Sequence, residues 1–382
     1  MSKFFSCYEN FADHAALPAI ATPITKLFGI KHPVLLAGMN VAAGPKLAAA
    51  VSNAGGLGVI GGVGYSPEML REQIQELKSF LAKPDLPFGV DLLLPQVGGS
   101  ARKTNYDYTK GKLEELVDIV IAEKASLFVS AVGVPPRFVV DKLHKAGIPY
   151  MKLVRPESLG KHGLNGTSSM IGHPKHVQKC IDAGCDIICA QGGEGGVPTS
   201  VLIPTVVDIC KGKKSPLTGQ DVLVVAAGGI FNGKGLAAVL AMGASAAWVG
   251  TRFILAEEAG APKAHQEAVI TSGYDDNVRT IIFTGRPLRV RKNPYIMNWE
   301  ENRKDEITKL TAKGVIPVEY DIEQLDKEDK LDDDTMDAAR PFLMGKVAAV
   351  CNEIKPAKAI VEEMVSEAIQ QIQKSSSMVA KL

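Results

Sequence analysis

Short apolar runs alternate with amphipathic segments along most of the chain. The runs are continuously apolar, which is typical of parallel strands that are covered on both faces. The segments between them carry apolar residues at helical spacing, and one of them begins with the capping pair Ser66-Pro67. We predict strands at 33–38, 57–61, 88–94, 127–132, 148–154, 186–190, 222–227 and 246–250. We predict helices between them at 45–54, 66–81, 113–125, 136–146, 174–183, 201–211 and 233–242.

Eight strand–helix repeats predict an α/β fold of the (β/α)8 TIM barrel type. They span residues 33–250, close to the roughly 250 residues of a typical barrel. A doubly wound open sheet is the alternative. It is the weaker interpretation because no Gly-x-Gly-x-x-Gly follows the first strand.

Two segments do not follow this alternation of strands and helices. Residues 155–169 are polar and rich in Gly and Ser, as in a loop or an insertion. After the eighth strand we expect helices at 257–272, 339–350 and 357–373, and we interpret the charged residues 321–337 as a solvated face. A basic run contains Arg286, Arg289, Arg291 and Lys292. We therefore expect a barrel at 1–256, a smaller α-rich cap domain at 257–340, and C-terminal helices at 341–382 that pack back on the barrel.

Composition excludes several classes of protein. The 43 basic and 42 acidic residues leave a net charge of +1, so bulk electrostatics do not favour binding to nucleic acid or to a membrane surface. The six cysteines are too few for a disulfide scaffold in a chain of this length. We expect Cys180, Cys185 and Cys189 to be buried apolar residues, with no metal site. Without a signal peptide or a long apolar stretch, we expect a soluble intracellular protein.

The carboxyl ends of the strands are where a barrel of this kind carries its active site. The loops after strands seven and eight form the usual phosphate cradle, and glycines there let backbone N–H groups approach an anion. Glycine pairs are also common as simple turns, which is the alternative interpretation. This rule selects Asp91 in strand three and residues that follow four other strands. They are Gly38, Met39 and Asn40 after strand one, Gln191, Gly192, Gly193 and Glu194 after strand six, Ala227, Gly228, Gly229 and Ile230 after strand seven, and Gly250, Thr251 and Arg252 after strand eight.

Five ordered motifs, at 32–39, 54–58, 190–196, 226–230 and 249–253, resemble nitronate monooxygenase, formerly called 2-nitropropane dioxygenase, in its eukaryotic, fungal-type form. The resemblance implies a (β/α)8 barrel with non-covalent FMN. It also implies oxidation of alkyl nitronates by oxygen to a carbonyl compound and nitrite. It assigns the flavin ring to Gly38, Met39 and Asn40, followed by Gln191 and Gly192, and we add Asp91. It assigns the phosphate to Gly228, Gly229, Gly250 and Thr251.

The sequence departs from this family at the expected base. The family motif continues past the glycines after strand six to a His, whereas Gly196 is followed directly by Val197. The weak substitutes are His173 and His176, which we interpret first as helix-start or packing residues, so the catalytic residue stays unassigned. His32 precedes strand one and belongs to the opposite end of the barrel. This gap and the extra residues 153–169 together suggest altered exon boundaries or a gene-model error.

Two other functions fit the same residues. One is an FMN-dependent NAD(P)H quinone or enoyl reductase, and the other is a catalytically impaired flavin-binding paralogue. We expect a small-molecule substrate and oxygen as partners, without nucleic acid or membrane, and leave a homodimer open. The C-terminal Ala380-Lys381-Leu382 is close to a Ser-Lys-Leu peroxisomal address, with the cytoplasm as the alternative.

Overall fold

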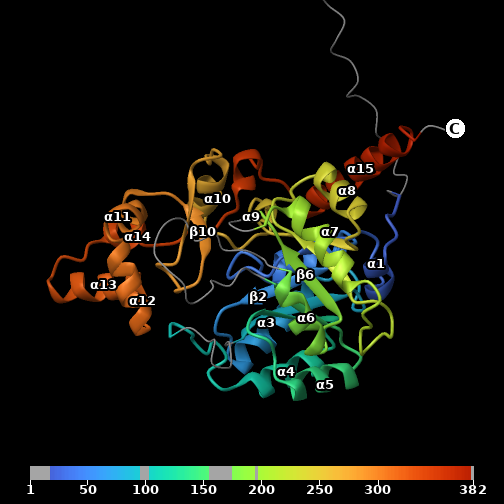
Figure 1. The fold of residues 1–382 in the computed structure, drawn as a ribbon, viewed down its shortest axis with the longest axis horizontal. Coiled ribbons are helices and arrows are strands. Elements are labelled where there is room, and N and C mark those ends of the chain that lie inside the picture. The colour runs from blue at the N-terminus through green and yellow to red at the C-terminus, as the bar shows by residue number, and fades with distance from the viewer. Residues whose placement is uncertain (1–17, 95–102, 155–173, 194–196, 380–382) are drawn as a thin grey trace, which may run out of the picture.

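Eight parallel strands close into a barrel at the centre of the molecule (Figure 1). The computed structural model describes residues 18–94, 103–154, 174–193 and 197–379. The strand order is β1-β8-β7-β6-β5-β4-β3-β2, and a parallel bridge between Leu35 and Leu57 joins the two ends. This closure confirms the barrel over the open doubly wound sheet. The strands are β1 (Val34–Leu36), β2 (Gly58–Gly62), β3 (Phe88–Leu94), β4 (Leu127–Val132), β5 (Tyr150–Val154), β6 (Ile187–Gln191), β7 (Leu223–Ala227) and β8 (Ala246–Val249).

Helices connect the strands on the outside of the barrel, close to the positions that the hydrophobic pattern predicts. The Ser66 hydroxyl caps α3 by accepting a hydrogen bond from Met69 N at 3.2 Å, as its place in the sequence suggests. The connecting helices are α2 (Pro45–Asn53), α3 (Pro67–Phe80), α4 (Leu113–Ala122), α5 (Arg137–Lys145), α6 (Lys175–Asp182), α7 (Thr199–Cys210) and α8 (Gly233–Ala241).

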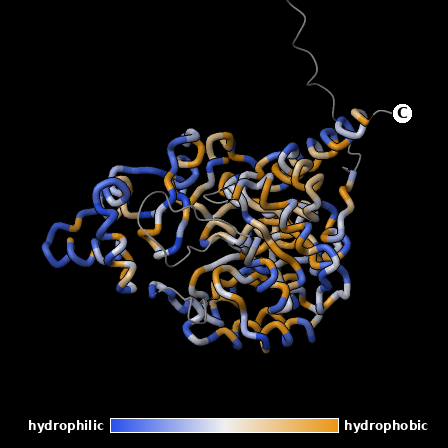
Figure 2. Tube along the Cα trace, viewed as in Figure 1, coloured by the Kyte–Doolittle hydropathy of each residue, from blue (hydrophilic) through white to orange (hydrophobic). Residues whose placement is uncertain are grey.

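Side chains of each strand alternate between the barrel interior and the layer under the helices. Leu35 and Met151 belong to the interior cluster, and Leu36 and Ile60 belong to the outer one. The short helix α1 (Pro23–Phe28) contributes Ile24 to the interior cluster from the amino ends of the strands. Because both strand faces are buried, most strand residues are apolar, as the orange segments of the barrel show in Figure 2.

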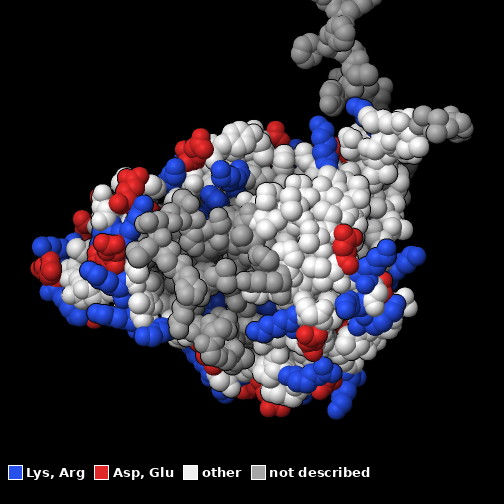
Figure 3. All heavy atoms as spheres, in the orientation of Figure 1, with Lys and Arg blue, Asp and Glu red and all other residues white. Residues whose placement is uncertain are grey.

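The cap contains a β-ribbon that the hydrophobic pattern did not predict. Its strands β9 (Asn277–Thr280) and β10 (Leu288–Arg291) pair antiparallel and lie beside α11 (Pro294–Asn302), α12 (Lys304–Lys313), α13 (Pro317–Lys327) and α14 (Asp333–Ala338). A separate hydrophobic cluster, with Ile282, Val290 and Trp299, holds the ribbon and these helices together. Charges of both signs cover the outside of the cap (Figure 3), and exposed pairs such as Lys327 with Glu323 confirm the solvated face.

Two predicted helices in this region were wrong. Of residues 257–272, only α10 (Lys263–Ile270) is helical, because Glu257 N instead donates to Lys355 O at 3.1 Å and Pro262 begins the helix. Of residues 339–350, only η1 (Lys346–Val350) is helical, as a 3-10 turn. The preceding residues run extended because Leu343 forms an antiparallel bridge with Val290.

The last helix, α15 (Ala357–Ser376), returns to the barrel and packs against α8 and α2. The approach to α8 is close: a Cβ on Gly233 would lie 2.4 Å from Ala368 N and from Met364 O. Glu367 Oε2 accepts a hydrogen bond from Gly233 N at 2.7 Å. This contact holds the start of α8, the helix that follows the glycines at the end of β7.

Candidate functional site

The carboxyl ends of β1, β2 and β3 meet at a tightly packed edge of the barrel mouth. Asp91 is 2% exposed, and a Cβ on Gly38 would lie 2.5 Å from its Oδ2 atom. A Cβ on Gly61 would lie 2.6 Å from the Cα of Gly38. The structure therefore brings the predicted residues Gly38 and Asp91 into direct contact, and it adds Gly61.

The loop after β1 folds back over this edge. Asn40 is exposed, and its Oδ1 accepts a hydrogen bond from Val63 N at 3.4 Å. Val41 takes a φ of 62°, which is strained for a β-branched residue and occurs mainly at functional positions. Met39 Sδ lies 3.7 Å from the place where a Gly250 Cβ would stand. The loop therefore joins the end of β1 to the end of β8.

The carboxyl ends of β6 and β7 are joined by hydrogen bonds. Gly192 N donates to Ala227 O at 2.9 Å, next to Gln191 at the end of β6. Thr199, the first residue of α7, donates from its hydroxyl to Gly228 O at 3.0 Å. Gly228 has a φ of +92°, and a Cβ there would lie 2.0 Å from Gly192 O, so only glycine fits.

An open cradle lies between the ends of β7 and β8. Gly229 is exposed with a φ of +76°, and a Cβ there would meet nothing within 4 Å. Within the described residues, neither Gly229 N nor Gly250 N has a backbone acceptor. The Thr251 hydroxyl accepts a hydrogen bond from Gly345 N at 3.0 Å, which ties the cradle to the segment before η1. Two N–H donors on residues that carry no Cβ suit an anion.

Sequence reasoning missed Tyr65 near the mouth. The Tyr65 ring packs so closely on Gly62 that a Cβ there would overlap the ring. The glycine at the end of β2 is therefore the sequence signal that could have pointed to Tyr65. Burial, with a smaller contribution from the charge of Asp91, raises the pKa of Tyr65 to about 12. The phenol therefore keeps its proton at neutral pH and can donate a hydrogen bond.

Sequence reasoning also missed the buried cation of Lys152 on β5. Its ammonium donates to Ser130 O at 3.2 Å and to Val132 O at 3.1 Å. Its neighbours Met151 and Leu153 point into the barrel, so Lys152 lies on the outer face of the sheet. Because Val132 has a strained φ of 69°, these bonds hold a turn at the end of β4 in place.

The histidine candidates do not gather at the cradle in the described residues. His176 is the second residue of α6 and is half-buried, whereas His173 lies outside the described residues. His32 precedes β1 at the amino end of the barrel, as predicted. The loop after β6 is short, because Gly193 N donates to Val197 O at 3.1 Å. Residues 194–196 between them lie outside the described residues.

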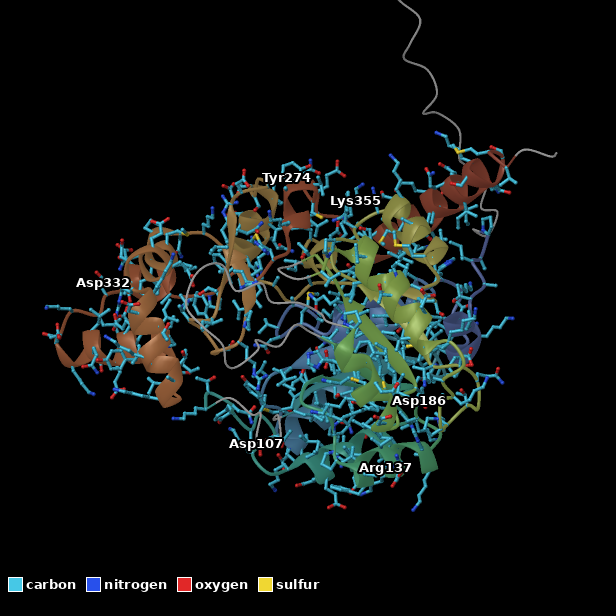
Figure 4. The ribbon with its side chains drawn as sticks, in the orientation of Figure 1. Asp107, Arg137, Asp186, Tyr274, Asp332 and Lys355 are labelled. Atoms are coloured by element: carbon cyan, nitrogen blue, oxygen red, sulfur yellow. The ribbon has the colours of Figure 1, made fainter. Side chains whose placement is uncertain are left out.

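A His–Asp–Ser group lies at the amino end of β6, far along the strand from the cradle. Asp186, labelled in Figure 4, is 1% exposed and accepts from the Ser215 hydroxyl at 2.6 Å and from Tyr150 N at 2.8 Å. His144 Nε2 lies 2.8 Å from Asp186 Oδ2, the oxygen that also accepts from Tyr150 N, whereas the Ser215 hydroxyl donates to Oδ1. The carboxylate sits between the imidazole and the hydroxyl, so the group joins structural elements and does not activate a nucleophile.

The family model for nitronate monooxygenase matches residues 21–367. The chain belongs to the nitronate monooxygenase family. This membership makes it an oxidoreductase and confirms the resemblance of the five motifs. A probable nitronate monooxygenase from Staphylococcus saprophyticus is 28% identical over 322 residues, which cover 74% of this chain and 81% of the relative. These bacterial relatives do not test the fungal-type assignment.

Other proteins that are similar to this chain carry different names. An octahydroindene-carboxyl-CoA dehydrogenase from Mycobacterium tuberculosis is 28% identical over 396 aligned residues, covering 94% of this chain and 99% of the relative. The structure of FabK from Thermotoga maritima matches with a TM-score of 0.69 at 28% identity, covering 94% of this chain and all of that one. Nitroalkane oxidase from Streptomyces ansochromogenes, at 23% identity, shares the fold with a TM-score of 0.69 over 92% of this chain and 99% of that one.

Among the described helices, none combines the length and apolarity needed to cross a bilayer. The tripeptide Ala380-Lys381-Leu382 lies outside the described residues. Cys180, Cys185 and Cys189 are buried, as expected, and so are Cys210 and Cys351.

Proposed function

We propose that the chain uses FMN to oxidise alkyl nitronates with oxygen, giving a carbonyl compound and nitrite. The observation that carries this proposal is the open cradle between β7 and β8. Among the described residues, Gly229 N and Gly250 N have no backbone acceptor, and neither glycine carries a Cβ of its own. Family membership supports the reaction, because nitronate monooxygenase is the description of the matching model.

The residues at the mouth fit FMN. A terminal phosphate takes two N–H donors at Gly229 and Gly250, with the Thr251 hydroxyl beside them. On the other side, Gly38, Met39 and Asn40 form the loop that would border the ring, and the bare backbone of Gly38 leaves room beside Asp91. Gln191, Gly192 and Gly228 would line the floor between them. FMN, when bound, supplies the electron transfer between nitronate and oxygen.

The protein binds the substrate, orients it and excludes water. Tyr65 keeps its phenolic proton at neutral pH, since burial raises its pKa to about 12, and it can donate to an oxygen of the nitro group. A nitronate is already an anion, so its oxidation requires no base. A neutral nitroalkane must first lose an α-proton, and a general base contributes roughly 10²–10⁴-fold to such a step.

This difference defines the experiment. Oxygen consumption by the purified protein is measured with propyl-2-nitronate and with 2-nitropropane, each at a series of concentrations. We expect turnover of the nitronate and little turnover of 2-nitropropane at neutral pH. Rapid oxidation of 2-nitropropane would show that another group, such as His176, takes the proton. A yellow protein that oxidises neither compound would contradict the proposal and favour an impaired flavin-binding paralogue.

A reductase or dehydrogenase is the second candidate. The observation in its favour is the likeness to a carboxyl-CoA dehydrogenase over 94% of the chain. The two functions separate under nitrogen: a reductase loses its flavin absorbance when NAD(P)H is added, whereas a nitronate monooxygenase loses it with propyl-2-nitronate. Bleaching by NAD(P)H alone would replace the proposed function with this one.

A further inference from the structure

The loop after β1 contains a strained turn whose central residue faces solvent. Ala42 N donates to Asn40 O at 2.7 Å, which closes a three-residue γ-turn centred on Val41. Val41 has a φ of 62°, and the positive-φ form of this turn is rare and strained, above all for a β-branched residue. The residue is nevertheless 60% exposed. Burial of the isopropyl group therefore does not explain why a valine occupies this position.

Neighbouring backbone holds this turn in place. Ala43 N donates to Met39 O at 3.0 Å, and Gly260 N donates to Ala42 O at 3.1 Å. Strained conformations persist only where the surrounding structure fixes them, and they gather at functional sites. Glycine or asparagine would adopt the same φ at position 41 with less strain. A valine at a position that favours those residues indicates a role for the isopropyl group itself.

A second exposed valine lies on the adjoining loop. Val63 follows β2, is 44% exposed, and donates from its N–H to Asn40 Oδ1 at 3.4 Å. The carboxylate at this edge of the mouth, Asp91, is only 2% exposed. Single exposed apolar residues are ordinary on protein surfaces, whereas these two valines stand on hydrogen-bonded loops at the ends of two barrel strands. They present an apolar surface at the mouth.

Met39 connects the strained turn to the open cradle. Its Sδ atom lies 3.7 Å from the place where a Gly250 Cβ would stand. It also packs in one hydrophobic cluster with Phe231, which follows β7, and with Ile254, which follows β8. Two residues separate Met39 from Val41 along the chain at most, so their Cα atoms lie within about 8 Å of each other. The valines and the cradle therefore border the same mouth.

Tyr65 gives the apolar surface an orientation relative to the substrate. It follows Val63 by two residues, and its phenol keeps its proton at neutral pH because burial raises its pKa to about 12. A nitronate that accepts a hydrogen bond from this phenol has its carbon substituent free to lie along the loops of Val63 and Val41. Each methylene removed from water there contributes up to about fourfold in affinity.

We propose that Val41 and Val63 bind the hydrocarbon substituent of the substrate, so that the chain prefers nitronates with a large apolar substituent over small ones. This inference rests on the proposed function and deepens it, because it names the substrate class and two residues that select it. An unbranched alkyl chain and an aromatic ring share the required chemistry. Both would cover the isopropyl groups that the two loops leave in water.

Turnover of a substrate series by the FMN-loaded chain tests the proposal. The substrates are the nitronates of nitroethane, 1-nitrobutane, 1-nitrohexane and 2-phenyl-1-nitroethane. We expect kcat/KM to rise by about tenfold or more from the nitroethane to the nitrohexane compound, mainly through a lower KM. A higher value for the phenyl than for the hexyl compound identifies the ring as the preferred substituent, and the reverse order identifies the chain. Turnover that does not increase with substituent size would overturn the inference while the proposed function stands.

A binding measurement separates the two ideas. Propionate, hexanoate and octanoate are titrated into the FMN-loaded chain, and the change in flavin absorbance is recorded. We expect the Kd to fall as the carboxylate lengthens. If no nitronate is oxidised but octanoate binds more tightly than propionate, the proposed function fails and the apolar surface is retained. Equal affinities, or no binding of any carboxylate, would count against the surface.

Variants distinguish a role in binding from a role in folding. Val41→Asn removes the isopropyl group but suits a positive φ, so we expect an unchanged or higher melting temperature together with a severalfold smaller ratio of hexyl to ethyl kcat/KM. Val63→Thr keeps the shape of the side chain and should lower the same ratio. Ile372→Thr, at a 40% exposed position of α15, is the control and should leave the ratio unchanged. A wild-type ratio in both valine variants would show that these residues do not select the substrate.

Discussion

The carboxyl group of Asp91 occupies the space that a side chain at position 38 would require. A Cβ built on Gly38 lies 2.5 Å from Asp91 Oδ2 and 2.6 Å from Asp91 Cβ. Asp91 lies within β3 and Gly38 in the loop after β1. The sequence selected the two residues separately and gave no sign that they touch. Their contact makes glycine a packing requirement at the edge of the mouth.

Gly38→Ala is therefore expected to displace Asp91 and the loop after β1. Overpacking of this kind costs about 1–3 kcal/mol of unfolding free energy. The displaced loop should also weaken retention of FMN, measured as the flavin-to-protein ratio after gel filtration. Gly44→Ala is the control, because its new Cβ would lie 3.6 Å from the nearest atom, Val41 O. Equal loss of flavin in both variants would argue against the Asp91 contact as the cause.

Gly229 allows the effect of charge at the cradle to be separated from backbone strain. Gly229→Asp and Gly229→Asn both place a side chain at a φ of +76°, and they differ in charge. We expect Gly229→Asp to raise the Kd for FMN roughly 100-fold or more, since an uncompensated carboxylate beside a phosphate costs several kcal/mol. Gly229→Asn should bind more tightly than the Asp variant. Indistinguishable flavin affinities, measured by fluorescence titration, would exclude a phosphate at this position.

Thr199 connects α7 to the turn at Gly228. Thr199→Val removes the 3.0 Å hydrogen bond to Gly228 O and should cost about 1 kcal/mol of stability, with a several-fold weaker hold on FMN. Thr205→Val is the matched control on the same helix, since its hydroxyl donates to Val201 O and does not reach β7. A larger loss of flavin in the Thr205 variant would contradict this role.

The short loop after β6 can be lengthened to test the missing base. Insertion of Gly-His-Thr-Gly-Asp between Gly196 and Val197 is expected to increase 2-nitropropane turnover by roughly 10²-fold or more while changing nitronate turnover little. The same insertion with Ala in place of His is the control. If the short loop distorts the pocket instead, both inserts raise turnover of both substrates, and the role assigned to the His would be wrong.

Acid is expected to destabilise the fold partly through His32. It is 4% exposed, its Nδ1 has no hydrogen-bond partner among the described residues, and burial lowers its pKa below 6.5. The unfolded chain therefore binds a proton more readily, and stability falls as the pH drops from 6.5 towards the lower folded pKa. His32→Gln should reduce the fall in melting temperature between pH 7 and pH 5. A fall equal to that of the wild type would assign the acid sensitivity to other groups.

The barrel could be predicted because each of its units is encoded locally. Ser66 caps the helix that its position predicts, and the continuous apolar runs are the strands. The cap ribbon was missed because β10 is only four residues long and its alternation of Leu288, Arg289, Val290 and Arg291 is a weak strand signal in a basic run. The predicted helix at 339–350 failed because the pairing of Leu343 with Val290 overrides local helix propensity.

Three features could be recognised without a structure: the eight strand–helix units, the glycines at the ends of β7 and β8, and the lack of a His directly after Gly196. These depend on residue type and on spacing within a few positions. Which distant residues meet is visible only in the folded chain: Gly38 with Asp91, Thr199 with Gly228, and Arg279 with Arg289. Such contacts depend on strand register and on the closure of the barrel, because a shift of one residue turns each side chain to the other face.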